Sequence, residues 1–390
     1  MNYFYGDINK IKVNDIKYSR IIIASPSRYP FGHANSVNVL RMAESFSDKG
    51  LNVHLIAFRS MFSRKKNIIR ETVLRYGSNY SFDKIFIYWP FDRFLNPVVG
   101  FIFFLFSLFY SRNTTLLVTR SNYAAFIGSL MGFDTVYESH SPPLTRTKKF
   151  IEKKLGGEKT VLFVLISKGL LKKYSEFSLL PESYIILPSG GRELFKENSD
   201  NNFYGEAKNI CYIGSLYKGR GFGLIYKISL KMPEKIFHVF GDTESLDLSK
   251  FKKMPKNLIL YGSLTPFQAE LLPRNFDILL MPYQNNVYLA NKLDTTDWMS
   301  PMKMFEYMFS KKPIISSDIE VLKEVLIHKK NSLLVEAENV DEWCNTIIKL
   351  DDPDLRSYLS KNAFETVSQN FTWEKRVEKI LKEIQLKNIR

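Results

Sequence analysis

Cysteine is scarce in this chain, and its scarcity excludes a class of folds. Cys211 and Cys344 are the only cysteines among 390 residues. Two thiols are too few for the disulfide framework of a small secreted domain or for a cysteine-based zinc site. Each stands within an apolar run, NICYIG and EWCNTII. We therefore expect two buried, unreactive thiols in a protein of a reducing compartment.

The chain also lacks a leader-like start and a long hydrophobic run. Residues 1–15 (MNYFYGDINKIKVND) do not show a charged start followed by an apolar core, so no signal peptide is expected. The most apolar run, residues 97–110 (PVVGFIFFLFSLFY), is shorter than the roughly 20 residues that span a bilayer. We expect it to form a buried or interfacial helix in a cytoplasmic protein that is soluble or peripheral.

Acidic residues are in deficit, and the excess positive charge predicts an anionic partner. Lysine and arginine number 55 against 40 aspartates and glutamates, a formal net charge of +15. Basic residues cluster at 63–66, 146–154 and 172–173, in the same half as the apolar run. Solvated helix faces would account for such clusters, but the neighbouring apolar run favours peripheral contact with the anionic inner face of the cytoplasmic membrane. The chain has no zinc finger, RNP-like strand pair or basic zipper, so we do not expect nucleic acid as a partner.

What the chain does contain is a regular alternation of short apolar strands and helical patterns. Strands are expected at 20–25, 53–58, 85–88, 116–119, 135–137, 161–166, 184–187, 210–214, 236–241, 258–262, 278–281, 313–316 and 332–335. Apolar strands separated by helices indicate parallel sheets covered on both faces. The fold class is therefore α/β, with two doubly wound domains in series. Their boundaries are predicted at 1–195 and 209–370, with a polar linker at 196–208 and a last segment at 371–390.

Two loops in the first half carry candidate binding residues, because ligands of such folds bind beyond the carboxyl ends of the strands. The strand 20–25 leads through Gly32 to a helix that Asn35 or Ser36 can cap. Such a helix start suits a phosphate or a sugar hydroxyl, although the loop is not GxGxxG and a plain turn is the alternative. His140 follows the strand 135–137, where it is either functional or a structural histidine. No carboxylate spacing supports a metal site made by His33 and His140.

Two stretches in the second half suit a phosphorylated ligand. The strand ending at Gly214 leads into a turn with Lys218, Gly219, Arg220 and Gly221, where a cation at a helix start favours a bound anion. A solvent-facing basic turn is the alternative. In SPMKMFE, Ser300 is predicted to cap a helix with Pro301 in its first turn.

That second helix combines groups for both parts of a nucleotide. The free amides of residues 302–304 and the Lys303 ammonium group suit a phosphate. One turn on, the Glu306 carboxylate can accept from the two vicinal hydroxyls of a ribose. The stretch therefore predicts a site for a sugar nucleotide.

These motifs together resemble the retaining GT-B glycosyltransferases of family 4. SPMKMFEYMFSKKPIISSD resembles the second part of that family's E-x7-E motif, and YIGSLYKGRG resembles its diphosphate loop, with Arg220 at the lysine position. YESHSPP resembles the D-x-H element, PFGHANS the glycine loop of the first domain, and ILPSGG the P-N-G element. FTWEKRVEKI resembles the terminal F-x-W helix. The resemblance covers nearly the whole chain and is strongest from 210 to 373.

The resemblance implies a fold and a set of site residues. The fold is GT-B, two Rossmann-like domains facing across a cleft, with residues 371–390 forming a helix that crosses back to the first domain. His140, Arg220 and Lys303 are implied to be catalytic, and Phe31, His33 and Asn35 to lie on the acceptor side. The implied donor-binding residues are Gly32, Gly214, Ser215, Arg220, Gly241, Ser263, Met302, Lys303, Met304 and Glu306.

Two positions depart from the family pattern. The place of the first glutamate, eight residues before Glu306, holds Trp298, and the usual arginine of the diphosphate loop is Ser215. Asp294 and Asp297 are therefore candidates for contact with the donor sugar. We interpret the departures as a difference in specificity.

The implied reaction is transfer of a sugar, with retention, from a UDP- or GDP-sugar to a glycan or lipid-linked acceptor. The implied pathway is bacterial surface polysaccharide synthesis, for example of lipopolysaccharide, O-antigen or capsule. Cations and helix amides would stabilise the departing diphosphate, so neither a metal nor another cofactor is expected. Three alternatives stay open: an epimerase of nucleotide sugars, a glycan phosphorylase, and a degenerate GT-B protein that binds a membrane or a partner.

Overall fold

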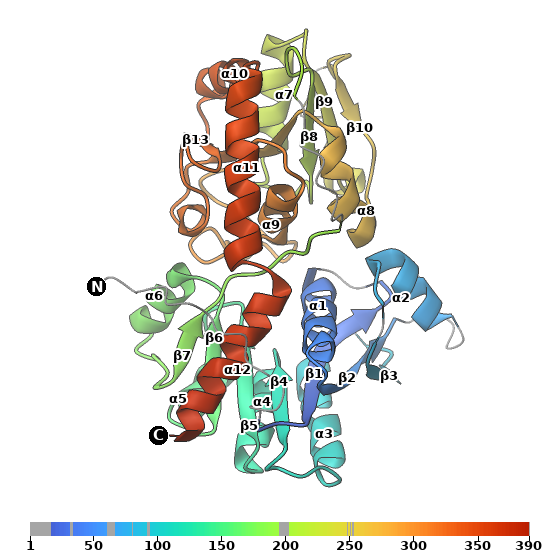
Figure 1. The fold of residues 1–390 in the computed structure, drawn as a ribbon, viewed down its shortest axis with the longest axis vertical. Coiled ribbons are helices and arrows are strands. Elements are labelled where there is room, and N and C mark those ends of the chain that lie inside the picture. Colours follow the sequence, from blue (N-terminus) through green and yellow to red (C-terminus); the bar gives the residue numbers. More distant parts are fainter. Residues whose placement is uncertain are drawn as a thin grey trace.

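The computed structural model describes residues 17–31, 34–60, 67–79, 81–91, 94–194, 203–247, 249, 251 and 253–389. Within them the chain forms two α/β domains, one above the other in Figure 1. This architecture confirms the predicted fold class. The predicted boundaries stay predictions, since most of the linker lies outside the described residues. Both cysteines are buried, as predicted.

The first domain is built on a seven-stranded parallel sheet in the order β3-β2-β1-β4-β5-β6-β7. Its strands are β1 (Arg20–Tyr29), β2 (Asn52–Arg59), β3 (Asp83–Tyr88), β4 (Thr115–Thr119), β5 (Asp134–Ser139), β6 (Val161–Leu165) and β7 (Tyr184–Ile186). Its helices are α1 (Ala34–Asp48), α2 (Ile68–Tyr76), α3 (Leu95–Ser107), α4 (Asn122–Leu130), α5 (Arg146–Gly156) and α6 (Lys168–Glu176). The order reverses between β1 and β4, the switch point where doubly wound folds place ligands.

The first strand is longer than predicted. It was expected to end at residue 25, but β1 continues to Tyr29 after a register shift between Ala24 and Arg28. Pro26 lies in that irregularity, where a missing ladder hydrogen bond is tolerated. Arg28 and Tyr29 then pair with Phe58 and Arg59 of β2.

The second domain has a six-stranded parallel sheet in the order β10-β9-β8-β11-β12-β13. Its strands are β8 (Asn209–Ile213), β9 (Ile236–Phe240), β10 (Leu258–Leu260), β11 (Ile278–Met281), β12 (Ile314–Ser317) and β13 (Leu333–Val335). Its helices are α7 (Phe222–Lys231), α8 (Pro266–Leu271), α9 (Met302–Phe309), α10 (Val340–Lys349) and α11 (Pro353–Asn370). Every residue of β11 and β12 is buried, as expected for central strands covered on both faces.

The last helix, α12 (Trp373–Ile389), crosses back onto the first domain, as predicted (Figure 1). Its apolar side joins the core between α1 and the first sheet, through Trp373, Val377, Ile380, Leu381 and Ile384. A bridge pairs Gly191, where the chain leaves the first domain, with Thr372, where the chain returns to it.

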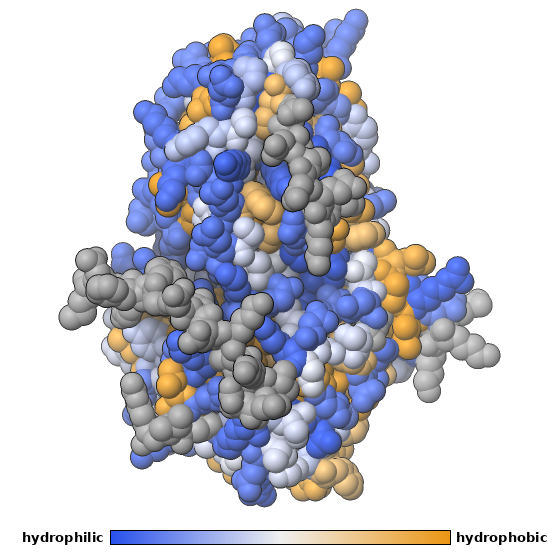
Figure 2. Space-filling view, viewed as in Figure 1, coloured by the Kyte–Doolittle hydropathy of each residue, from blue (hydrophilic) through white to orange (hydrophobic). Residues whose placement is uncertain are grey.

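The apolar run 97–110 forms most of α3, and the helix is half-buried. Val99 and Phe103 pack against the sheet, while Phe101, Leu108 and Phe109 are exposed. Figure 2 shows apolar surface at this lower end of the molecule. Among the described residues, no helix is both long enough and apolar enough to cross a membrane.

Candidate functional site

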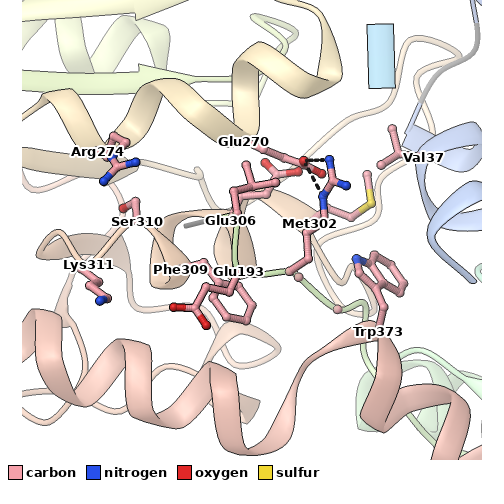
Figure 3. Close-up of a pocket in the computed structure, with 14 residues that line it drawn as sticks. Val37, Glu193, Glu270, Arg274, Met302, Glu306, Phe309, Ser310, Lys311 and Trp373 are labelled. Carbon is pink, nitrogen blue, oxygen red and sulfur yellow. Dashed lines mark hydrogen bonds and ion pairs between the residues drawn. The ribbon is translucent and has the colours of Figure 1, made fainter. Parts of the chain in front are cut away.

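The candidate site lies in a pocket at the junction of the two domains. Val37 of α1 and Arg192, which follows β7, line it from one side. Met302 and Glu306 of α9 line it from the other side, with Glu270 of α8 above them (Figure 3). The first turns of α1 and α9 therefore border the same space.

The start of α9 differs in one detail from the prediction. Ser300 was expected to cap the helix, but Pro301 is the N-cap residue and the helix begins at Met302. The Ser300 side chain instead accepts a hydrogen bond from the amide of Ser189 at 2.9 Å and so joins the two domains. The Met304 amide donates to the Pro301 carbonyl at 3.1 Å. Of the three predicted amides, those of Met302 and Lys303 lack an intrahelical acceptor.

Lys303 is a buried cation at this helix start. Its Nζ atom lies 4.0 Å from the ring centroid of Tyr212 and 5.2 Å from that of Tyr283. Among the described residues, the ammonium group has no hydrogen-bond partner. Burial, and then the neighbouring Arg220, hold the pKa of Lys303 well below its ordinary value. An unpaired buried ammonium group is costly, so this position favours an anion.

Arg220 comes to the same place from the turn after β8. Its guanidinium carbon lies 5.6 Å from the Tyr283 ring centroid, and its Nε is buried without a partner among the described residues. Both residues predicted to bind the diphosphate therefore flank one tyrosine.

Glycine is required at four of the predicted positions around these cations. Gly219 and Gly221 have φ of 83° and 94°, and a Cβ atom there would lie 1.8 Å from the Asn286 carbonyl oxygen and 2.0 Å from that of Pro282. At Gly214, a Cβ atom would lie 2.4 Å from the Lys303 Nζ. At Gly241 it would lie 2.2 Å from the Gly214 carbonyl oxygen, so Gly241 supports the loop by close packing.

Two serines in the predicted donor set follow strands of the second sheet, Ser215 after β8 and Ser263 after β10. The Ser215 carbonyl accepts from the Tyr212 hydroxyl at 2.7 Å, which fixes the start of the loop. Ser263 follows β10 and is exposed.

Glu306 lies one turn into α9, beside Glu270. Burial, and then the Glu270 carboxylate, raise the pKa of Glu306 to about 8, against the attraction of Lys303. The side chain therefore exchanges its proton close to neutral pH. The side chain lines the pocket, and its role as an acceptor for a diol stays a prediction.

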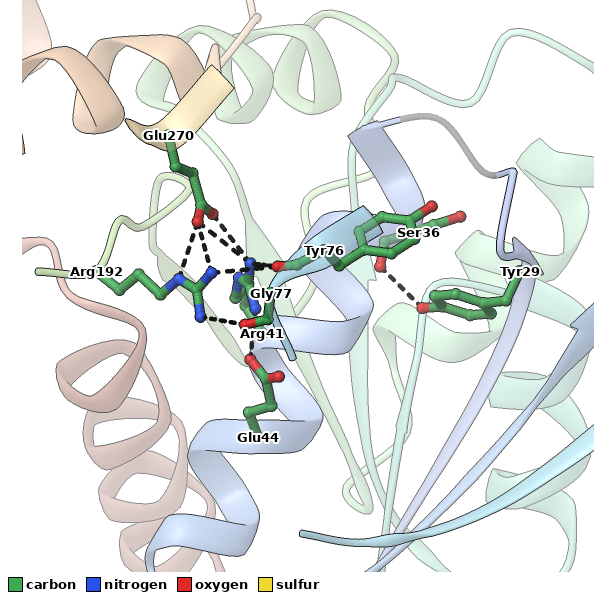
Figure 4. A network of polar contacts seen from close by, with 8 residues as sticks. All are labelled: Tyr29, Ser36, Arg41, Glu44, Tyr76, Gly77, Arg192 and Glu270. Atoms are coloured by element: carbon green, nitrogen blue, oxygen red, sulfur yellow. Dashed lines mark hydrogen bonds and ion pairs between the residues drawn. The ribbon is translucent and has the colours of Figure 1, made fainter. Parts of the chain in front are cut away.

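An ion-pair network that sequence reasoning missed surrounds Glu270 (Figure 4). Glu270 lies 3.1 Å from Arg41 of α1 and 2.6 Å from Arg192. Arg41 also pairs with Glu44 at 2.8 Å. Both arginines donate to the Tyr76 carbonyl at the end of α2. A single acidic residue of a short helix carries no sequence signal for this role.

His140 follows β5 at the carboxyl edge of the first sheet. Its Nε2 is hydrogen-bonded to Glu138, which in turn pairs with Arg376 of α12 at 2.8 Å. Burial, and then Arg120, lower the pKa of His140 to about 4. Its imidazole is therefore neutral at physiological pH.

The predicted substitutes for the missing glutamate are engaged elsewhere. Asp294 accepts from Asn286 at 2.8 Å and from the Thr296 hydroxyl at 2.6 Å, which closes its own loop. Asp297 pairs with Lys173 of α6 at 3.0 Å. Trp298 is buried in a hydrophobic cluster of the first domain, and its carbonyl accepts from Ser167 at 3.0 Å. Asp297 and Trp298 therefore make this segment an interdomain contact, because both residues bind to the first domain. Asp294 instead stabilises the loop itself.

The structure describes two of the three residues predicted on the acceptor side, Phe31 and Asn35. Gly32 and His33 lie outside the described residues. Phe31 is 48% exposed and stacks under Arg75, with 5.4 Å between the guanidinium carbon and the ring centroid. Asn35, in the first turn of α1, has a buried side-chain oxygen without a partner among the described residues. No cluster of three or more metal-ligating side chains occurs in the described parts of the chain.

Sequence comparison relates the second half of the chain to a known family. Residues 207–352 match the family model of glycosyl transferases, group 1. An uncharacterized glycosyltransferase of Methanocaldococcus jannaschii is 28% identical over 184 residues. That match spans 44% of this chain and 44% of the relative, so it spans less than half the length of the relative.

Comparison of structures shows the GT-B fold over nearly the whole chain. Sucrose-phosphate synthase from Thermosynechococcus elongatus superposes with a TM-score of 0.70 at 14% identity, over 95% of this chain and 98% of that one. Anabaena HepE in complex with UDP and glucose gives 0.68 at 13%, over 95% and 100%. S. aureus TarM, in complex with UDP, gives 0.70 at 10%, also over 95% and 100%.

Proposed function

We propose that the chain is a retaining glycosyltransferase of family 4 that uses a UDP- or GDP-sugar as donor. The observation that carries this proposal is the convergence of Arg220, Lys303 and the first amides of α9, one turn from Glu306. Fixed cations and free amides suit a diphosphate, and the carboxyl group of Glu306 can accept a hydrogen bond from the ribose diol. The match of residues 207–352 to a glycosyl transferase family, and the UDP bound to two structures of the same fold, support it.

The chemistry that this arrangement favours is stabilisation of a departing diphosphate. As the bond from the anomeric carbon to the phosphate oxygen breaks, negative charge develops on that oxygen. Arg220 and Lys303 are already fixed against Tyr283, so little reorganisation is needed to meet this charge. The acceptor hydroxyl would attack from the face that the diphosphate leaves and pass its proton to it. These cations supply the charge that a divalent metal would otherwise provide, so we expect a reaction independent of metal.

Thermal denaturation with a panel of free nucleotides, without metal, tests this proposal. We expect one nucleoside diphosphate to raise the melting temperature selectively, since a ligand at about 100 times its Kd stabilises by ~2.7 kcal/mol. Lys303→Met should abolish the shift. The control Lys361→Met removes an exposed charge from α11 of the same domain, away from the predicted diphosphate loop, and should keep it. No shift with any nucleotide in the wild-type protein would contradict the proposal and favour a binding-only protein.

We also propose that the acceptor is a glycan or lipid-linked sugar of a bacterial surface polysaccharide, reached at the cytoplasmic membrane. The proposal rests on one face of the first domain, where α3, α4 and α5 lie side by side. Exposed apolar side chains on this face include Phe101, Leu108, Phe109 and Phe150. Exposed cations follow on α5, among them Lys153. Apolar and cationic side chains on one face suit an anionic lipid surface.

Co-sedimentation with vesicles of anionic lipid tests the membrane proposal. Leu108→Asp should reduce binding, because it removes apolar area from the proposed face and adds a negative charge. Leu230→Asp is the matched control, since Leu230 of α7 is 54% exposed on the other domain and Leu108 is 61% exposed. Equal binding of the two variants, or no binding at low salt, would contradict the proposal.

A further inference from the structure

An ion pair and a hydrogen bond link the C-terminal helix to His140. Arg376 of α12 lies 2.8 Å from Glu138, and both side chains are 3% exposed. The same guanidinium group donates to the Leu187 carbonyl at 2.7 Å and to the Pro188 carbonyl at 3.0 Å. Glu138 uses its other oxygen to bond Nε2 of His140. Arg376 of α12 therefore fixes the Glu138 carboxylate, and this carboxylate in turn orients the His140 ring.

The direction of the hydrogen bond between Glu138 and His140 follows from charge. Burial opposes ionisation of Glu138, but Arg376, His140 and Arg120 together outweigh burial and lower its pKa below the ordinary value. An ionised carboxylate only accepts hydrogen bonds, so Nε2 of His140 must carry the proton. The imidazole is neutral at physiological pH, and its Nδ1 atom therefore presents a lone pair.

The backbone on both sides of His140 is also fixed. Lys148 of α5 donates to the Ser141 carbonyl and hydroxyl oxygens, each at 2.8 Å. On the other side, the Ser139 hydroxyl is 2.8 Å from the Tyr174 hydroxyl. The His140 side chain keeps 24% of its surface exposed, and its Nδ1 bonds to none of the described residues. The accessible atom of a rigidly held ring is therefore a hydrogen-bond acceptor.

We propose that Arg376 and Glu138 are positioning residues, which fix His140 with its Nε2–H on Glu138 and its bare Nδ1 ready to accept from a substrate hydroxyl. This inference rests on the proposed glycosyl transfer, whose substrates are rich in hydroxyl groups. It assigns His140 to a hydroxyl and not to the diphosphate, because a neutral acceptor is repelled by phosphate oxygens. The diphosphate is left to Arg220 and Lys303 of the other domain.

Nuclear magnetic resonance of the full chain labelled with ¹⁵N-histidine tests the assignment without any substrate. The chain has five histidines, and His140→Gln identifies the signal of interest. We expect the neutral Nε2–H form of His140 from pH 8 down to about 5. Its titration should be centred near pH 4, well below the ordinary 6.5. A wild-type signal that titrates near 6.5, or that shows the Nδ1–H form, would overturn the proposal.

Two variants should move this titration in opposite directions. The charged groups nearest the ring are Arg120 after β4, Glu138 of β5, Lys148 of α5 and Arg376 of α12, and of these Glu138 raises its pKa while both arginines lower it. Arg376→Met should therefore raise the midpoint from about 4 toward 6.5. Glu138→Gln should lower it and mix the two neutral forms, because an amide both donates and accepts. Simple loss of structure would bring both variants toward 6.5, and that result would contradict the proposal.

Two controls separate this inference from folding and from the proposed function. Arg376→Lys should retain the wild-type tautomer, and Lys375→Met removes a cation from the same helix turn, where it bonds the Gln369 carbonyl instead of Glu138. The stabilisation by nucleotide should persist in Arg376→Met, since Arg220 and Lys303 are unchanged. If Arg376→Met alone lost the thermal stabilisation by nucleotide, the assignment of the diphosphate to Arg220 and Lys303 and of a hydroxyl to His140 would be overturned. Failure of the wild-type protein to bind any nucleotide would refute the proposed function and leave the tautomer measurement intact.

Discussion

Glu306 is a carboxylic acid held between a second carboxylate and a buried ammonium group. Burial and Glu270 raise its pKa from 4.5 to about 8, although Lys303 opposes them. The folded protein therefore keeps a proton that the unfolded chain releases above about pH 4.5. Stability from this group is complete below pH 4.5 and is lost as the pH rises through 8.

This linkage predicts a pH-dependent effect of Glu306→Gln. The amide does not titrate, so the variant should gain melting temperature relative to the wild-type protein as the pH rises from 5 to 8.5. Thermal denaturation without ligand at several pH values measures the difference. Glu193→Gln, at an exposed position lining the same pocket, is the matched control. A constant difference across this range would show that Glu306 is not buried beside Glu270.

At the scale of elements, the loop between β11 and α9 is an anchor between the domains. Trp298 leaves its own domain and packs in the cluster formed by Tyr137, Phe163 and Leu170. The chain passes so close to α6 that a Cβ atom at Gly169 would lie 1.7 Å from the Asp297 carbonyl oxygen. Glu324 adds a carboxylate at the start of α6, accepting from the Lys168 amide at 2.9 Å.

We expect Trp298→Ala to destabilise the protein by about 3 kcal/mol, the usual cost of emptying a buried indole site. Chemical denaturation measures this loss, with Trp298→Phe as the control that keeps an aromatic ring. Because the anchor joins two domains, the Ala variant should also unfold in two separate transitions. A single transition at the wild-type midpoint would contradict this role.

Much of this fold could be predicted from the sequence, since apolar strands and capped helices are local patterns. The site was predictable where its residues follow strand ends, as Gly214, Arg220 and His140 do. Trp298 was not, because its apolar surroundings come from the other domain and leave no trace in neighbouring residues. The same holds for Arg41 and Glu270, which are 229 positions apart in sequence. Serine is a common helix N-cap, but the Ser300 hydroxyl accepts a hydrogen bond from the Ser189 amide instead of capping α9. That partner lies in the other domain and could not be predicted from neighbouring residues.

At the scale of the whole molecule, the network around Glu270 joins the domains on the side of the pocket. Glu270 belongs to the second domain, and Arg41 and Arg192, which pair with it, belong to the first (Figure 4). The side chains of Arg41 and Glu270 are 1% and 8% exposed. Ion pairs this well buried are weakly screened by salt, and loss of one partner leaves charges without compensation.

We therefore expect Glu270→Gln to favour separation of the domains. Small-angle X-ray scattering should show a larger radius of gyration for this variant than for the wild-type protein. Glu44→Gln is the matched control, because it removes a carboxylate from the same arginine within the first domain. An equal response of both variants, or of neither, would contradict the interdomain role of Glu270.

The position of α12 has a consequence for synthesis of the chain. The core beneath α1 is completed by five apolar residues that lie between 373 and 384, although most of that core comes from the first half of the sequence. Because these residues follow the second domain in sequence, a ribosome makes them only after that domain has been synthesised. The first of these two domains therefore completes its core after the second has been made, and its apolar surface between β1 and α1 stays uncovered until α12 has been synthesised.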